Sequence, residues 1–145
     1  MLGAEEACLS KGGTCIRLSG LYNLQRGAHN FWLMSGKDVA GSPDGLINQI
    51  HCDDAAGVCL AAIKAGKEKC QDKIFIVSDS NPLTRYQICE SALQAACYKD
   101  VKMPTFAMEA TGTPVGKVYD CSYTYSHLDW KPRYESFDAF MKANA

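Results

Sequence analysis

The stretch Thr14-Cys15-Ile16-Arg17-Leu18-Ser19-Gly20-Leu21-Tyr22 lies almost at the start of this 145-residue chain. Residues 14–18 are rich in β-branched and apolar side chains, which favours a short strand. The strand runs into Gly20 and Tyr22, and a polar loop is predicted at 23–30. A strand this apolar is unsuited to an exposed sheet edge. We therefore expect other protein to cover residues 14–18.

The remaining pattern alternates strands with helices. Residues 74–78 form an unbroken apolar run, which predicts a strand buried on both faces, as in a parallel sheet. A further strand is predicted at 46–51, after a turn at 41–45. Helices are predicted at 3–10, 55–65, 85–98 and 136–143. This alternation indicates an α/β fold.

Local signals fix several helix ends. Gly12 follows the first helix, and Gly66 follows the second, as C-terminal caps. Asp53 or Asp54 is the expected N-cap of the second helix, and Thr84 that of the third. Residues 103–117 are expected to be irregular. Three residues near the C-terminus are expected to form a packing clamp for the last helix: Trp130, Pro132 and Tyr134.

Composition excludes several functional classes. The net charge of −1 gives no electrostatic reason to expect nucleic acid as a partner. No apolar run approaches the roughly 20 residues that span a bilayer, and residues 1–6 lack the features of a secretory signal. The eight cysteines form no Cys-x-x-Cys pair, which argues against a metal site. They are interpreted mostly as small buried side chains in a reducing intracellular compartment, either the cytoplasm or an organelle such as a chloroplast or mitochondrion.

Four blocks, in order, resemble motifs of the extended and atypical short-chain dehydrogenase/reductases, the NAD(P)-dependent epimerase/dehydratase-like proteins. The first is the opening strand with Arg26, similar to an RxxGxYGPGR loop. The second, residues 50–56, is similar to an HVDDxA junction. The others are residues 74–79 with Pro82 and Arg85, and residues 128–137, similar to LGWxPRYPSF.

The resemblance implies the C-terminal, substrate-side portion of a Rossmann-like fold, with the N-terminal dinucleotide-binding half absent. Residues 1–145 would then be a single partial domain. This chain alone is expected to hold no cofactor, and NAD or NADP would require the missing half. Residues 112–117 contain glycines and a lysine but miss the spacing of a phosphate loop. Tyr98 and Lys102 have the spacing of the family's catalytic Tyr/Lys pair, but only at a frayed helix end.

Candidate site residues follow from the same resemblance, each with a structural alternative. The resemblance implies that Ser19, Gly20, Leu21 and Tyr22 bind the cofactor, on the nicotinamide-side loop. The alternative is a tight turn at a strand end. The residues implied on the substrate side are Arg26, His29, His51 and Arg85. As alternatives, Arg26 and His29 are solvated, His51 orients a loop, and Arg85 pairs with Asp79.

Two functions compete. In the first, the chain lacks the cofactor fingerprint and the catalytic pair, is non-catalytic, and serves as a scaffold or accessory subunit. In the second, it is the substrate-side fragment of an active NAD(P)-dependent oxidoreductase or epimerase. A small-molecule-binding module is a third and weaker interpretation.

Overall fold

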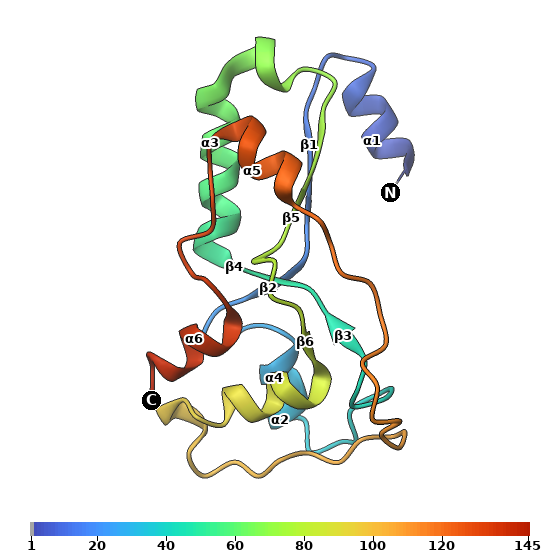
Figure 1. The fold of residues 1–145 in the computed structure, drawn as a ribbon, viewed down its shortest axis with the longest axis vertical. Coiled ribbons are helices and arrows are strands. Elements are labelled where there is room, and N and C mark those ends of the chain that lie inside the picture. The colour runs from blue at the N-terminus through green and yellow to red at the C-terminus, as the bar shows by residue number, and fades with distance from the viewer. Residues whose placement is uncertain (1) are drawn as a thin grey trace.

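A computed structural model describes residues 2–145, so that Met1 lies outside the description (Figure 1). In chain order the elements are α1 (Leu2–Leu9), β1 (Cys15–Leu18), β2 (Gly20–Tyr22), α2 (Ala28–Met34), β3 (Leu46–Ile47), β4 (Gln49–His51), α3 (Cys52–Cys70), β5 (Ile74–Val77), β6 (Leu83–Thr84), α4 (Arg85–Ala92), the 3₁₀ helix η1 (Ala96–Tyr98), α5 (Ser122–Leu128) and α6 (Phe137–Lys142). The α/β alternation predicted from the sequence is confirmed.

The strands form three two-stranded ladders. β1 pairs with β5 and β2 pairs with β4, both in parallel, while β3 pairs with β6 in antiparallel. The predicted strands at 14–18 and 74–78 are therefore confirmed. The single strand predicted at 46–51 is wrong, because the chain changes partners at Asn48. The side-chain amide of Asn48 donates to the carbonyl of Lys117 (2.7 Å) and accepts from the N–H of Tyr119 (3.0 Å). Residue 48 therefore belongs to neither ladder.

The expectation that β5 is buried on both faces is also wrong. Phe75 and Val77 are fully buried, whereas Ile76 is 36% exposed. Side chains alternate between the two faces of a strand. One face of the β1–β5 ladder therefore packs against α3 and α5, and Figure 1 shows α1 alongside β1 on the other side. Within residues 2–145, β1 pairs with β5 alone.

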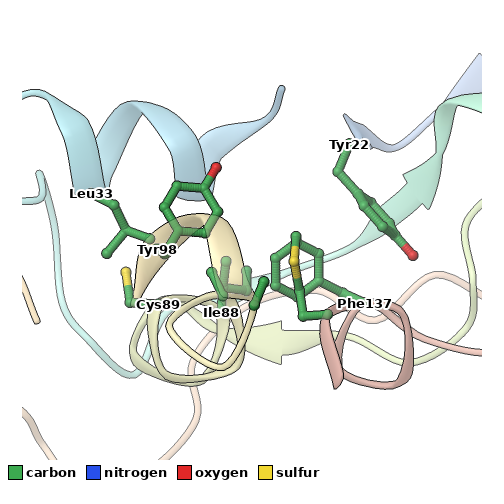
Figure 2. Packing of buried hydrophobic residues seen from close by; sticks show 9 residues of the cluster. Tyr22, Leu33, Ile88, Cys89, Tyr98 and Phe137 are labelled. Carbon is green, nitrogen blue, oxygen red and sulfur yellow. The ribbon is translucent and has the colours of Figure 1, made fainter. Parts of the chain in front are cut away.

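Two hydrophobic cores divide the molecule along its long axis. The core of the β1–β5 end is built from α3, β5 and Leu128, with Trp130 packed against it. The core of the other end gathers around Ile88 and Cys89 of α4. In Figure 2, Phe137 of α6 lies between Ile88 and Tyr22. The Tyr22 and Phe137 rings are 4.9 Å apart in an edge-on arrangement. β2 and β4 connect the two ends (Figure 1).

The predicted helices are present, but several begin or end at other residues than predicted. The Thr84 cap is confirmed, with a reciprocal capping box to Gln87, but α4 ends at Ala92 rather than 98. α3 extends to Cys70, past a non-helical Gly66 with φ of 79°. The predicted first and last helices match α1 and α6. α5 was not predicted, because its polar sequence lacks a repeating apolar stripe. No helix within residues 2–145 is long and apolar enough to cross a membrane.

Candidate functional site at the strand ends

Three segments meet where the parallel strands β1 and β5 end and where β2 and β4 begin. The N–H of Ser19 donates to the carbonyl of Val77 (3.0 Å), and the N–H of Gly20 to that of Asn48 (3.0 Å). The N–H of Asp79 donates to the carbonyl of Gln49 (2.7 Å). In open α/β sheets, ligands bind outside the carboxyl ends of the strands. This place, which we call the strand-end junction, is therefore the candidate site.

Buried polar atoms gather at the junction. Five side-chain atoms here lack a hydrogen-bond partner within the described chain: Ser19 Oγ, Tyr22 Oη, Gln49 Oε1, His51 Nε2 and Asp79 Oδ2. An unsatisfied buried polar atom costs about 1–3 kcal/mol. Buried polar groups in proteins normally have hydrogen-bond partners, so these unpaired atoms are available to bind a polar ligand or ordered water.

Tyr22 is the most enclosed of these residues. Its side chain is fully buried, and its ring contacts those of His51 and Phe137 edge-on. Burial, followed by the charge of Asp79, raises the pKa of Tyr22 far above its usual value. The hydroxyl therefore stays protonated and can donate or accept a hydrogen bond, but cannot act as a base near neutral pH.

His51 and Asp54 organise the start of α3. His51, rather than Asp53 or Asp54, is the N-cap, and its Nδ1 accepts from the N–H of Asp53 (3.1 Å). The predicted aspartate cap is wrong because Asp54 points elsewhere. Its buried carboxylate accepts from the N–H groups of Arg133 (2.8 Å) and Tyr134 (3.0 Å). His51 thus caps α3 through Nδ1, and burial lowers its pKa.

Asp79 and Arg85 do not pair, so that expectation is wrong. The Asp79 carboxylate accepts from the N–H of Asn81 (2.9 Å), and burial raises the pKa of Asp79 to about 6. Arg85 instead donates from Nη1 to the carbonyl of Ser42 (3.2 Å) and packs against Gly45. The turn at 41–45 encloses the guanidinium, which separates it from the carboxylate of Asp79.

The predicted loop at 23–30 ends early, because α2 begins at Ala28. Arg26 is exposed, as in its structural alternative. His29 is fully buried, and its Nε2 lies 3.3 Å from the carbonyl of Leu24. Burial lowers the pKa of His29. The structure therefore gathers Ser19, Gly20, Tyr22 and His51 at the junction, and places Leu21 at the surface.

Thr111 and Gly112, at the start of the glycine-containing segment 112–117, bind a carboxylate of this chain. Oδ2 of Asp44 accepts from the N–H of Gly112 (3.0 Å) and from the N–H and hydroxyl of Thr111. These backbone donors lower the pKa of Asp44. Within 112–117, the N–H groups of Gly112 and Val115 are thus engaged by Asp44.

Sequence reasoning missed Gln49 and Asp79 as members of the junction. A signal for Gln49 is present, because Asn48-Gln49 interrupts an otherwise apolar stretch at 46–50. A polar pair inside an apparent strand indicates a break or a site rather than a packed ladder.

No protein-family model matches the chain, and no curated protein matches it in sequence. Solved structures do match. UDP-glucuronic acid 4-epimerase from Bacillus cereus, in complex with UDP-glucuronic acid and NAD, is similar over 99% of this chain, with a TM-score of 0.75 and 16% identity. UDP-glucose 4-epimerase from Thermotoga maritima, with UDP-glucose, is similar over 91%, with a TM-score of 0.66 and 17% identity. dTDP-glucose 4,6-dehydratase from Bacillus anthracis, in complex with NAD, is similar over 97%, with a TM-score of 0.68 and 14% identity.

The chain therefore shares its fold with NAD-dependent epimerases and dehydratases. It spans 49%, 44% and 48% of the three matched chains, which is about half of each. The α/β, Rossmann-like partial fold expected from the four sequence blocks is confirmed at this level.

Proposed function

We propose that the chain is the substrate-side half of an NAD(P)-dependent epimerase/dehydratase-type domain and acts as a non-catalytic scaffold or accessory subunit of a larger assembly. Residues 1–145 form a single partial domain in this proposal. The observation that carries it is the one-sided pairing of β1, which joins only β5 among the described residues. The other edge of a strand offers a row of backbone donors and acceptors to a further strand.

Exposed apolar side chains on the strands support a protein partner. Leu18 and Leu21 are each 38% exposed, and Ile76 is 36% exposed. Leu18 lies on β1 itself, whereas Ile76 lies on the paired strand β5 and on the opposite face of the ladder, because its register partner is Arg17. Apolar surface of this kind is typical of protein–protein contacts.

The residues that resemble a catalytic pair support the non-catalytic role. The Tyr98 hydroxyl donates to the carbonyl of Leu24 (2.9 Å) and bonds with the side chain of Asn30 (2.9 Å). Burial raises the pKa of Tyr98 to about 12. A tyrosine held in this way fixes the end of η1 to α2. In the proposal, NAD or NADP belongs to the complementary half.

The proposal is tested with a double variant, Leu18→Glu with Ile76→Glu. The measurement is the sedimentation of the tagged chain in an extract of the cells that produce it. We expect the wild-type chain to sediment as an assembly larger than its 15.8 kDa and the double variant as a monomer. Phe31→Glu on α2, where the side chain is 67% exposed, is the matched control and should sediment like the wild type. A monomeric wild-type chain contradicts the proposal.

A second function is favoured by the strand-end junction. The unpartnered atoms of Tyr22, His51 and Asp79 suit the substrate side of an active NAD(P)-dependent oxidoreductase or epimerase. In this alternative Ser19, Gly20, Leu21 and Tyr22 face the nicotinamide, and the substrate-side residues are Arg26, His29, His51 and Arg85.

Ligand titration separates the two functions. The scaffold role predicts no change in melting temperature with NAD⁺, NADP⁺ or UDP-glucose. The enzyme role predicts a saturable rise with UDP-glucose or a dinucleotide, measured on the chain with whatever partner copurifies. Tyr22→Phe removes only the hydroxyl, so it should abolish such a rise, while Tyr123→Phe on the exposed face of α5 should leave it unchanged.

A further inference from the structure

The eight cysteines occupy three kinds of environment, and none forms a disulfide in the structure. Cys70, Cys89 and Cys121 are buried, while Cys59 and Cys97 are exposed. The expectation that most of the cysteines are buried is therefore wrong, since only three of the eight are. Cys8 and Cys15 form a separate case, since they lie on α1 and β1 at either side of one tight turn.

The thiols of Cys8 and Cys15 reach into each other's segment. Sγ of Cys8 donates to the carbonyl of Thr14, the residue before Cys15, at 3.7 Å. Sγ of Cys15 donates to the carbonyl of Glu5, one turn before Cys8 on α1, at 4.0 Å. Each thiol therefore lies against the backbone of the segment that carries the other.

A second contact, an ion pair, joins the same faces of α1 and β1 that carry Cys8 and Cys15. Glu5 and Cys8 are three residues apart on one face of the helix. Arg17 and Cys15 are two residues apart on one face of the strand. Glu5 and Arg17 form a two-pronged ion pair, with Nε–Oε1 at 2.9 Å and Nη2–Oε2 at 2.6 Å. The ion pair and the thiols thus join the same two faces.

Gly13 provides the space for this arrangement. A Cβ at residue 13 would lie 2.4 Å from Sγ of Cys8, so that a larger residue there would displace the thiol. The turn itself is closed by the N–H of Gly13 donating to the carbonyl of Cys8 (3.0 Å).

We propose that Cys8 and Cys15 are a site of reversible disulfide formation that locks α1 onto β1. With a small-molecule disulfide such as oxidised glutathione as oxidant, one thiolate attacks it and releases one glutathione thiolate. The second cysteine thiolate then displaces the other glutathione, forming the Sγ–Sγ bond. Two protein thiols are oxidised, one glutathione disulfide is reduced to two thiols, and two protons pass to the thiolates released.

The inference is independent of the proposed function, because it concerns a bond within the chain. Its effect falls on α1, the helix that lies against β1. A covalent link across residues 8–15 restricts the motion of α1 relative to the strand, whereas the reduced form relies on the Glu5–Arg17 ion pair and the turn.

Trypsin provides a direct test, because it cleaves after Lys11 and after Arg17. The purified chain, with Cys59→Ser and Cys97→Ser to prevent links between molecules, is incubated with oxidised glutathione, alkylated and digested. We expect peptides 1–11 and 12–17 to appear as one disulfide-linked species that dithiothreitol separates. The linked species should form faster at pH 8.5 than at pH 7, since burial, followed by the Cys8 thiol, raises the pKa of Cys15.

Variants make the outcome decisive. Cys8→Ser and Cys15→Ser should each abolish the linked species, and Gly13→Ala should slow its formation at least severalfold. Cys52→Ser, at a half-buried cysteine on α3, is the matched control and should change nothing. Recovery of both peptides fully alkylated, or as separate glutathione adducts, would overturn the proposal.

Discussion

The carboxylate of Asp54 accepts the backbone N–H groups of two consecutive residues, Arg133 and Tyr134, at 2.8 and 3.0 Å. It thereby ties the first turn of α3 to the segment that leads into α6. The centroids of the Tyr134 and His51 rings also lie 4.1 Å apart. This contact unites the two ends of the molecule through one buried side chain, 4% exposed.

Replacing Asp54 should therefore destabilise the chain strongly. Asp54→Ala removes a buried carboxylate and leaves two backbone N–H groups in partly buried positions without their acceptor, at about 1–3 kcal/mol each. We expect a loss of about 2–5 kcal/mol in the free energy of unfolding, measured by urea denaturation. The neighbouring Asp53→Ala, at an exposed position, should cost less than 1 kcal/mol. Equal losses in the two variants would contradict the role assigned to Asp54.

Asp79 should make stability depend on pH. Its pKa is raised from 3.8 to about 6, so the folded state binds the proton more tightly than the unfolded state. The stabilisation is fully present below pH 4 and is lost as the pH rises through 6. The shift corresponds to about 3 kcal/mol.

Asp79→Asn should remove this dependence, because the amide keeps an acceptor for the N–H of Asn81 without the charge. We expect the variant to gain stability relative to the wild type between pH 4 and 7. Unfolding curves of both proteins are compared at each pH, since the lowered pKa values of His29 and His51 act in both and cancel. A constant difference across this range would rule out the titration of Asp79.

Asn48 should control the long segment 103–120. Its side chain holds the carbonyl of Lys117 and the N–H of Tyr119, so Asn48→Ala frees that segment locally. We expect tryptic cleavage after Lys117 to become severalfold faster, as followed by mass spectrometry. Cleavage after Lys64, in α3, serves as the internal control and should keep its rate.

Gly45 and Arg85 should show energetic coupling. A Cβ at residue 45 would lie 1.6 Å from Nη1 of Arg85, so Gly45→Ala must displace the guanidinium from the carbonyl of Ser42. We expect Gly45→Ala to cost about 1 kcal/mol in the wild type and much less in the Arg85→Ala background. Gly3→Ala, which meets nothing within 4 Å, is the matched control. Additive effects in the double variant would show that the clash is relieved elsewhere.

The sequence predicted those parts of the fold that local patterns determine. The apolar runs at 14–18 and 74–78 and the Thr84 cap carry their own signal, and the structure confirms them. Asp54 was assigned to the wrong role because a cap and a long-range acceptor need the same residue type at the same place. The partner 80 residues away decides between them. Ile76 was expected to be buried, because an apolar side chain gives no indication of whether a neighbour covers it.

The candidate site was predictable only in part, for the same reason. Ser19, Gly20 and Tyr22 follow a strand, so their place at its carboxyl end can be inferred locally. Gln49 and Asp79 come from two segments far apart in the chain, and the N–H of Asp79 joins these segments at the junction by donating to the carbonyl of Gln49. Likewise, Arg85 is turned away from Asp79 by the turn at 41–45, which no pattern near residue 85 reveals.

The contact between Asp54 and Tyr134 also bears on how the chain folds. Its sequence separation is 80 residues, and β1 likewise finds its partner strand only across α3. Contacts of such long range must pay for closing a large loop before they stabilise anything, which slows folding. α3 can form early from local hydrogen bonds, but its first turn is fastened only when residues 133–134 arrive. We therefore expect the closure of the C-terminal segment onto α3 to come late in folding.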